Sequence, residues 1–258
     1  MTEWNPDVYL TFEKERTQPA IDLVAKINHP DPKHIIDVGC GPGNSTSVLK
    51  RKWPNAEIIG IDNSIKMIER AKERDKGINW ICADASSNLS QYGKFDVIFS
   101  NAAIHWIPNH VVLLRDLYNL LNEKGALAIQ IPSTSTLPLH IDLDKLARGN
   151  KWKTIFTSIS NNFSNHDVNF YYDILTGLSN RFELWTTEYI HIMDEHQDII
   201  KWYSSTGLKA YIACIKEVEM QKEFLFDYEK LLKKSYAVQG NKKILFPFKR
   251  LFFIAYKS

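Results

Sequence analysis

The sequence predicts an α/β fold in which a mostly parallel sheet carries helices on both faces. The main observation is that apolar strand-like runs and amphipathic helical patterns alternate strictly from residue 34 to about residue 131. Such alternation is typical of parallel strands joined by helical crossovers. The size agrees, because 258 residues, 44% of them hydrophobic, suffice for one large domain with insertions.

Short apolar runs predict the strands of this region, and an acidic residue stands at the end of each of the first three. The helix between the fourth and the fifth strand has a leucine-rich face, and Gly125 is expected to end that helix. The predicted strands cover residues 34–37, 57–62, 80–85, 95–100 and 126–131.

A glycine-rich turn follows the first strand, within residues 37–44. Gly39, Gly41 and Gly43 stand at alternate positions, where glycine lets the backbone take positive φ and lets a ligand approach the main chain. A strand, this turn and a helix start indicate a nucleotide site, with an ordinary β–α turn as the alternative. The spacing is shorter than in dinucleotide folds, and Asp37 would repel a phosphate but suit a cationic amino group. A nicotinamide cofactor is therefore disfavoured.

The next two strands also end in acids. Asp62 comes about twenty residues after the glycine turn, where a carboxylate can accept hydrogen bonds from both hydroxyls of a ribose. Asp84 ends the third strand; a lone Asp there is more often a helix cap or a solvated turn residue. Three acids at successive strand ends, in this order, favour binding of an adenosyl compound.

The remaining segments divide the chain around this core. An alternating, half-exposed strand is predicted over 182–192, a long amphipathic helix over 215–236 and a last strand over 251–256. The predicted parts are a helical N-terminal lid (1–32), a cofactor-binding core (33–132) and helical substrate-cap insertions (133–180 and 194–240), all within a single domain of 1–258.

Composition limits the function. Lys plus Arg (32) nearly balance Asp plus Glu (30), so a general nucleic-acid binder is not expected. A basic stretch from Lys242 lacks acids and is either a solvated edge or a surface that attracts an anionic substrate. Cys40, Cys82 and Cys214 are too scattered for disulfides or a metal cage and are expected to be reduced core thiols. Neither a signal peptide nor a membrane span is expected, so we predict a cytoplasmic protein.

The substrate should lie beyond the carboxyl ends of the strands, as ligands do in open α/β sheets. Asn101 ends the fourth strand and should face the cofactor. His105 and Trp106 follow at the same edge and are candidates to border the acceptor. The alternative for His105 is a hydrogen-bonded residue at a helix start, and the alternative for Trp106 is a core or pocket-wall residue. His140, in the loop after the fifth strand, is a further candidate at the rim.

The motif Asp-x-Gly-x-Gly-x-Gly resembles the first motif of the S-adenosylmethionine-dependent methyltransferases. Along nearly its whole length the chain is similar to the trans-aconitate methyltransferase family. This resemblance implies a Rossmann-like fold with a seven-stranded, mostly parallel sheet and one antiparallel strand near the C-terminus. The segments that carry it include Trp4-Asn5-Pro6, 37–46, 60–62, 127–132, 171–175, Trp185-Thr186-Thr187, 206–208 and 248–255.

The resemblance implies S-adenosylmethionine as the cofactor and assigns its contacts. Asp84 would meet the adenine amino group and the backbone amide of Ala85 a ring nitrogen, while Tyr9 and Arg16 would fold over the cofactor as a lid. The full set of implied cofactor-binding residues is Asp37, Gly39, Gly41, Gly43, Asn44, Asp62, Asn63, Met67, Asp84, Ala85, Asn101, Tyr9 and Arg16.

The implied reaction is methylation of one carboxylate of a small tricarboxylic acid. A carboxylate is already ionised at neutral pH, so neither a catalytic base nor a metal is expected, only alignment. The acid would be held by His105, Trp106, His140, Tyr171, Tyr172, Lys209 and Arg250. His105 and the segment Ser133-Thr134-Ser135 depart from the family pattern at the expected pocket, so the acceptor can differ.

Several alternatives remain open at this stage. The acceptor can be another small acid or an amine. A nucleic acid or protein acceptor is less favoured, because Ala102-Ala103-Ile104, rather than an amine-binding motif, follows Asn101. A non-catalytic protein that binds S-adenosylmethionine is a third alternative, although no motif glycine or strand-end acid is missing. A monomer without a membrane or nucleic-acid partner is expected.

Overall fold

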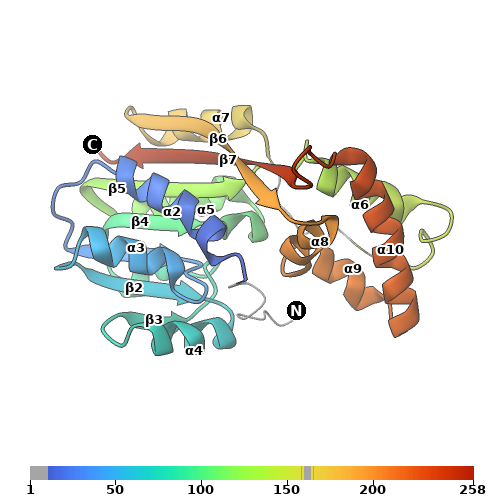
Figure 1. Ribbon diagram of the computed structural model, residues 1–258. Helices are drawn as coiled ribbons and strands as arrows, with labels where there is room; N and C mark the ends of the chain where they lie inside the picture. Colours follow the sequence, from blue (N-terminus) through green and yellow to red (C-terminus); the bar gives the residue numbers. More distant parts are fainter. Residues whose placement is uncertain (1–10, 158, 160–163, 165) are drawn as a thin grey trace. The chain divides into compact units, whose positions relative to one another are not determined.

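The structure is a computed structural model that describes residues 11–157, 159, 164 and 166–258 (Figure 1). The chain forms two compact units. The sheet unit comprises 13–132, the described parts of 162–187, and 250–258, and the helical unit comprises the described parts of 1–12, 133–161 and 188–249.

A seven-stranded sheet with the order β3-β2-β1-β4-β5-β7-β6 confirms the predicted fold class. The strands β1 to β5 pair in parallel, and β7 pairs with β5 in antiparallel orientation. Their bounds are His34–Val38 (β1), Glu57–Asp62 (β2), Asn79–Cys82 (β3), Phe95–Asn101 (β4), Leu121–Pro132 (β5), Phe182–Met193 (β6) and Ile244–Tyr256 (β7).

Helices pack around this sheet. In the sheet unit α2 (Glu13–Lys26) contacts α3 (Asn44–Lys52), and α5 (His110–Asn119) contacts α7 (Val168–Leu178). Figure 1 shows α2 and α3 in front of the strands. The other elements of this unit are α4 (Ile65–Arg74) and the short 3-10 helices η1 (Leu89–Tyr92) and η2 (Ile104–Trp106).

Between β4 and β5, the predicted helix end at Gly125 is wrong. The helix α5 ends at Asn119, and β5 already begins at Leu121, which pairs with Phe95. Gly125 therefore lies inside a strand and does not end a helix. A Cβ on Gly125 would lie 2.8 Å from the Asn122 carbonyl oxygen, so the close approach of the backbone at this register shift requires glycine.

The helical unit has an apolar core of its own. Its helices are α6 (Pro138–Arg148), α8 (His196–Ser204), α9 (Leu208–Cys214) and α10 (Val218–Ser235). Aromatic rings fill the space between them; the rings of Trp152 and Phe224, for example, meet edge to face at 5.0 Å between centroids. Such a core of large side chains gives this unit a packed interior, to which β6 contributes Met193 and β7 contributes Phe246 and Phe248.

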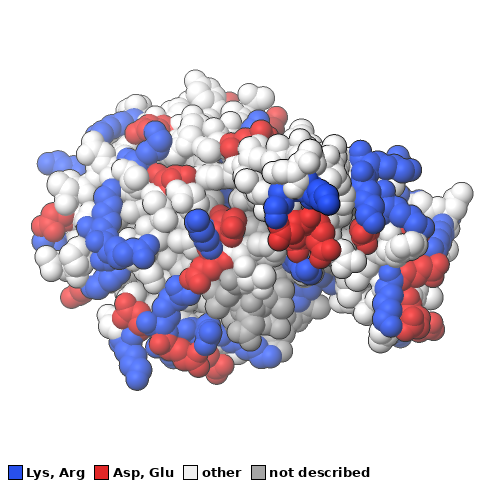
Figure 2. All heavy atoms as spheres, in the orientation of Figure 1, with Lys and Arg blue, Asp and Glu red and all other residues white. Residues whose placement is uncertain are grey.

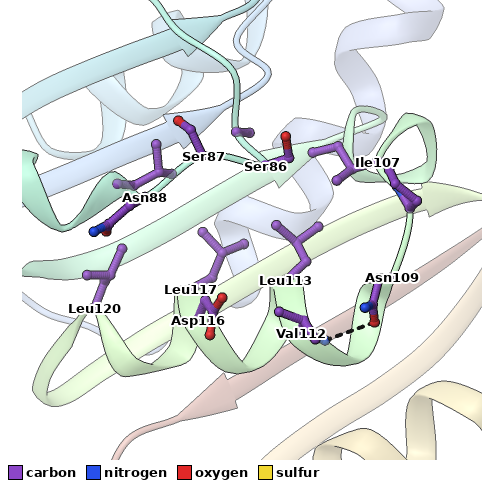
Figure 3. A pocket seen from close by; sticks show the side chains of 13 residues that line it. Ser86, Ser87, Asn88, Ile107, Asn109, Val112, Leu113, Asp116, Leu117 and Leu120 are labelled. Atoms are coloured by element: carbon purple, nitrogen blue, oxygen red, sulfur yellow. Dashed lines mark hydrogen bonds between the residues drawn. The ribbon is translucent and has the colours of Figure 1, made fainter.

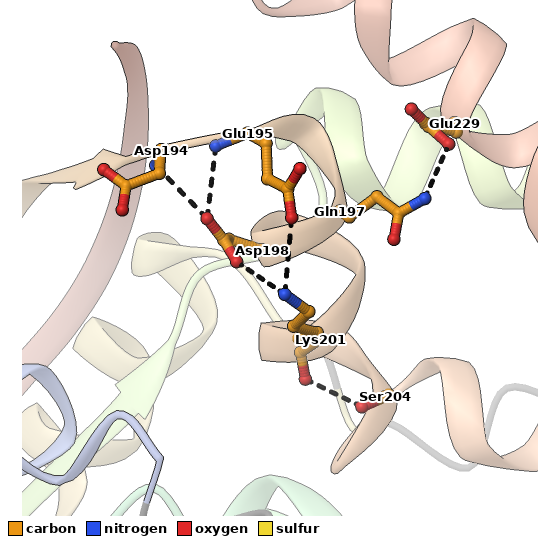
Figure 4. A network of polar contacts seen from close by, with 7 residues as sticks. All are labelled: Asp194, Glu195, Gln197, Asp198, Lys201, Ser204 and Glu229. Atoms are coloured by element: carbon orange, nitrogen blue, oxygen red, sulfur yellow. Dashed lines mark hydrogen bonds and ion pairs between the residues drawn. The ribbon is translucent and has the colours of Figure 1, made fainter.

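The first turn of α8 is held by a small polar network (Figure 4). Asp198 Oδ2 accepts hydrogen bonds from the backbone N–H groups of Asp194 and Glu195, at 3.2 and 3.1 Å. Lys201 donates to Asp198 Oδ1 at 3.0 Å. These bonds satisfy N–H groups that the start of a helix leaves open, so the network serves the fold of this unit.

Residues 13–32 and 166–180, for which the sequence predicts parts of a lid and of a cap, belong to the sheet unit. One prediction about cysteines is wrong: Cys82 is exposed, because it ends β3 at the edge of the sheet and its side chain points away from the core, whereas Cys40 is buried as expected.

The surface carries charges of both signs. Figure 2 shows Lys and Arg interspersed with Asp and Glu on one face, in agreement with the small net charge of +2. In the part of the chain that the structure describes, none of the helices is long and apolar enough to span a membrane.

Candidate functional site

The glycine turn after β1 has the predicted geometry. Gly39, Gly41 and Gly43 have φ values of 74°, 55° and 87°. The turn is tied to β2, because the N–H groups of Gly39 and Cys40 both donate to the Ile61 carbonyl, at 2.8 and 2.9 Å. A Cβ on Gly41 would meet nothing within 4 Å, so this glycine borders open space that a ligand can approach.

Asp37 lies beneath this turn and is fully buried. Its Oδ2 accepts hydrogen bonds from Ser45 Oγ at 2.7 Å and from Thr46 Oγ1 at 2.6 Å. Its Oδ1 has no hydrogen-bond partner among the described residues. Burial raises the pKa of Asp37 to about 6, although the two hydroxyl bonds oppose the shift. A cationic group placed at Oδ1 would both satisfy this oxygen and stabilise the carboxylate.

Asp62 ends β2 with its carboxylate against the same turn. Oδ2 accepts from the Gly41 N–H at 3.0 Å, and Oδ1 accepts from the Ser64 N–H at 2.9 Å. Burial raises the pKa of Asp62, and these backbone bonds oppose the rise. Each oxygen keeps a lone pair that a ligand hydroxyl can use.

Asp84 is exposed and forms a local turn. Its Oδ1 accepts from the backbone N–H and the hydroxyl of Ser86, at 2.8 and 2.7 Å. This is the turn role that the sequence offered as the alternative, and it leaves Oδ2 available to a ligand.

A cavity of about 320 Å³ begins at the residues that follow Asp84 (Figure 3). One end is formed by Ala85 and Ser86, and the side chains of α5, among them Leu113 and Leu117, form an apolar wall. A flat apolar ring beside the Ala85 amide would find such a wall. The full lining is Ala85, Ser86, Ser87, Asn88, Leu89, Ile107, Pro108, Asn109, Val112, Leu113, Asp116, Leu117 and Leu120.

The first turn of α3 is joined to α2 by side chains. Asn44 Nδ2 donates to Glu13 Oε1 at 2.9 Å and to Thr17 Oγ1 at 3.3 Å, while Asn44 Oδ1 is buried without a partner among the described residues. Arg16 is buried on the same helix α2. Tyr9, the other predicted lid residue, lies outside the described residues.

Two further predicted cofactor residues lie after β2. Met67 is buried on α4, with an exposed fraction of 3%, and Asn63 is exposed in the loop between β2 and α4. The edge of the turn at β2 thus presents Asn63 to solvent, whereas Met67 contributes to the core beneath it.

A buried histidine, His110, follows β4 and is hydrogen-bonded to a tyrosine. His110 Nε2 lies 2.9 Å from the Ile104 carbonyl, which can only accept, so Nε2 carries the proton. His110 Nδ1 therefore accepts a hydrogen bond from the Tyr171 hydroxyl at 2.6 Å. Tyr171, predicted to bind substrate, is 0% exposed and is committed to this contact. The same contact holds the η2 turn that carries His105 and Trp106.

Arg250 and Gln130 meet at the carboxyl end of β5. Arg250 begins the part of β7 that pairs with β5 and is 3% exposed. Its Nη1 donates to Gln130 Oε1 at 3.3 Å. Burial, and then the charge of Arg250, lower the pKa of His105 to about 3, so this imidazole is neutral. Gln130 is not among the predicted site residues, although a single polar residue within an apolar strand run indicates a buried group with a function.

The remaining predicted substrate residues are dispersed. Tyr172 is 52% exposed, and its ring meets that of Phe182 at 5.9 Å. His140 and Lys209 belong to the helical unit, where His140 Nδ1 lies 3.0 Å from the Tyr203 hydroxyl. Within the sheet unit, the structure places His105 near Arg250, and Asp62 against the glycine turn near Asp37.

The chemistry of this edge fits an adenosyl amino acid. Asp37 Oδ1, which has no hydrogen-bond partner among the described residues, fits an ammonium group. The two carboxylate oxygens of Asp62 each keep a lone pair that fits a ribose hydroxyl. The space beside Gly41 admits a ligand close to the backbone. Within the described ranges, no group of three or more His, Cys, Asp or Glu is arranged to hold a metal ion.

Comparisons with known proteins agree with this chemistry. Residues 30–196 match the model of a family described as a methyltransferase domain. A trans-aconitate 2-methyltransferase of Rhodopseudomonas palustris (strain BisB18) is 38% identical over 258 residues, with all of both chains covered. One from Escherichia coli O157:H7 is also 38% identical over 258 residues, again with both chains fully covered.

Solved structures show the same fold at low sequence identity. The YcgJ protein of Bacillus subtilis has a TM-score of 0.61 at 14% identity, over 93% of this chain and 98% of that one. Phosphoethanolamine N-methyltransferase 2 of Haemonchus contortus, in complex with S-adenosylhomocysteine, has a TM-score of 0.54 at 14% identity, over 93% of this chain and 52% of that one.

Proposed function

Because the chain belongs to the family of the trans-aconitate methyltransferases, which use S-adenosylmethionine, we propose that it methylates one carboxylate of trans-aconitate to give a monomethyl ester. The family relationship over the full length supports the acceptor. The structural observation that carries the proposal is the buried Asp37, whose free oxygen lies under a glycine turn beside Asp62.

The cofactor contacts follow from the groups that this edge leaves available. We assign the ammonium group of the methionine moiety to Asp37 Oδ1 and the ribose hydroxyls to Asp62. The adenine lies at the Ala85 end of the cavity, with its amino group toward Asp84 Oδ2. Asn101 Oδ1, which is buried without a partner among the described residues, faces the methionine end.

When bound, the sulfonium supplies an electrophilic methyl group for in-line displacement. A carboxylate oxygen forms the new O–CH₃ bond, and the electron pair of the broken C–S bond stays on sulfur. No proton moves, so the chain supplies no base. Its residues hold the two reactants in line, an effect that contributes about 7–11 kcal/mol in well-oriented reactions.

The acid needs cations and donors. Arg250 is the proposed main cation, because a guanidinium pairs with a carboxylate through two parallel hydrogen bonds. His105 is neutral and can offer an N–H, and Trp106 forms a wall on the same η2 turn. Lys209 and His140, the predicted substrate residues that belong to the helical unit, stay predictions.

The setting proposed for this enzyme is a monomer in the cytoplasm that acts on a small molecule. Its three cysteines are free thiols, which agrees with a reducing compartment. The near balance of charge does not favour a nucleic-acid partner.

The test is methyl transfer from labelled S-adenosylmethionine to a panel of acids. The panel holds trans-aconitate, cis-aconitate, isocitrate, citrate and a monocarboxylic acid. We expect rapid transfer to trans-aconitate and a product that base hydrolyses. Transfer to a different acid only would refute the acceptor. Absence of transfer to any acid, with S-adenosylhomocysteine still bound in calorimetry, would refute carboxyl methylation.

A further inference from the structure

The carboxyl end of β5 holds a buried amide with only one of its two ends satisfied. Gln130 is 0% exposed. Its Oε1 accepts a hydrogen bond from Arg250 Nη1 at 3.3 Å, whereas its Nε2 has no hydrogen-bond partner among the described residues. An unpaired buried N–H donor is unfavourable, so this group points to a ligand that completes it.

Arg250 determines which way the amide faces. A guanidinium only donates hydrogen bonds, so the amide oxygen of Gln130 must face it and the amide nitrogen must face away. The pair therefore offers N–H donors from a neutral amide beside those of a positive charge. This combination suits an anion with two oxygens.

The pair lies at the strand edge that carries the glycine turn. In the sheet register Gln130 stands beside Asn101, and Pro132 stands beside Arg250. The loop that follows Asn101 packs against the turn, since a Cβ on Gly39 would lie 2.1 Å from Ala103 Cβ. The nearby His105 is neutral, so it adds a donor but no second charge.

We propose that Gln130 and Arg250 together bind a carboxylate of the acid other than the one that is methylated. This inference rests on the proposed function and deepens it. A carboxylate held by a guanidinium and an amide has its lone pairs engaged and is a poorer nucleophile, so the reacting carboxylate must be a different one. The pair thus selects acids with at least two carboxylates over monocarboxylic acids.

The test uses two substitutions of Gln130 in the full chain. Gln130→Met keeps the size and removes the donor, and Gln130→Glu places a carboxylate where it pairs with Arg250 and repels the acid. We expect KM for trans-aconitate to rise about 10–100-fold, more for Glu than for Met. The dissociation constant of S-adenosylhomocysteine should change by less than about twofold, because the proposal assigns the pair to the acid and not to the cofactor.

Two controls separate binding from structure. Ser179→Ala removes another buried polar group of the sheet unit, which donates to the Tyr256 carbonyl at 2.6 Å, and should leave KM unchanged. Turnover of a monocarboxylic acid should respond to neither Gln130 substitution. An unchanged KM for trans-aconitate, or an equal loss of turnover with the monocarboxylic acid, would overturn the proposed role of Gln130 and Arg250. A parallel loss of cofactor affinity would show a merely structural role and would overturn it as well.

Failure of the proposed function gives a different result. In that case the wild-type protein methylates no acid. Calorimetry with tricarballylate, an unreactive tricarboxylate, in the presence of S-adenosylhomocysteine then tests the pair alone. Binding by the wild type that Gln130→Glu abolishes supports the pair, and binding that survives in Gln130→Glu, or is absent in the wild type, overturns it.

Discussion

The ionised carboxylate of Asp37, which we expect to bind the cofactor, should lower the stability of the ligand-free protein. Its carboxyl group is fully buried, and its pKa is raised from 3.8 to about 6. A raised pKa means that the folded protein binds this proton more tightly than the unfolded chain does. The ionised form therefore destabilises the ligand-free fold, and the penalty grows as pH rises from about 4 to about 6.

The size of the effect follows from the shift. Two pKa units correspond to roughly 3 kcal/mol at neutral pH, and about 1 kcal/mol of this penalty is already present near pH 4.5. Replacing Asp37 by Asn removes the charge and keeps an oxygen for the hydroxyls of Ser45 and Thr46. We expect Asp37→Asn to gain about 2 kcal/mol of unfolding free energy relative to the wild type between about pH 4.5 and about pH 7.5.

Urea unfolding at both pH values measures this difference, and the comparison of two chains cancels the other titrating groups. Asp96→Asn is the matched control. Burial raises the pKa of Asp96, but bonds from Asn122, His34 and Lys33 outweigh it and lower that pKa, so its effect on stability must have the opposite sign with pH. A pH-independent difference for Asp37→Asn, or one that falls as pH rises, would refute the reasoning. Asp37→Asn should also lose most of its affinity for S-adenosylmethionine.

Three further substitutions test other contacts. Asp62→Asn should weaken S-adenosylhomocysteine binding by about 10-fold or more in calorimetry, because each lost charge-assisted bond is worth about 1.5–3 kcal/mol; an unchanged dissociation constant would remove the ribose assignment. Gly39→Ala should destabilise the fold far more than Gly93→Ala in thermal unfolding, since both have positive φ but only a Cβ on Gly39 would clash, at 2.1 Å; equal losses would contradict the close approach. Tyr171→Phe should lose about 1–2 kcal/mol of stability, because it leaves the buried His110 Nδ1 without its 2.6 Å donor; a stability equal to that of the wild type would contradict that hydrogen bond.

The sequence was sufficient for the features that depend on local order along the chain. The alternation of strands and helices predicts the parallel part of the sheet, and the acids at strand ends predict that Asp37 and Asp62 meet at one edge. These predictions succeed because parallel strands bring their carboxyl ends to the same edge whatever the details of packing.

Contacts between distant residues were not predictable in the same way. The bond between His110 and Tyr171 joins residues 61 apart, and that between Gln130 and Arg250 joins residues 120 apart. Both depend on how α7 and β7 pack against the central strands, which no local pattern specifies. The position of Gly125 was misread for a related reason, since pairing of Leu121 with Phe95 ends the helix early.

The most direct test of the central claim is the identity of the product formed from trans-aconitate and S-adenosylmethionine that carries a ¹³C-labelled methyl group. We expect a single labelled methyl ester on one carboxylate, seen by NMR and as a mass increase of one methyl group, with less product from Asp62→Asn than from the wild type at a cofactor concentration that does not saturate the variant. A label found on a carbon of the acid, or no transfer to the acid by a protein that binds the cofactor, would contradict carboxyl methylation.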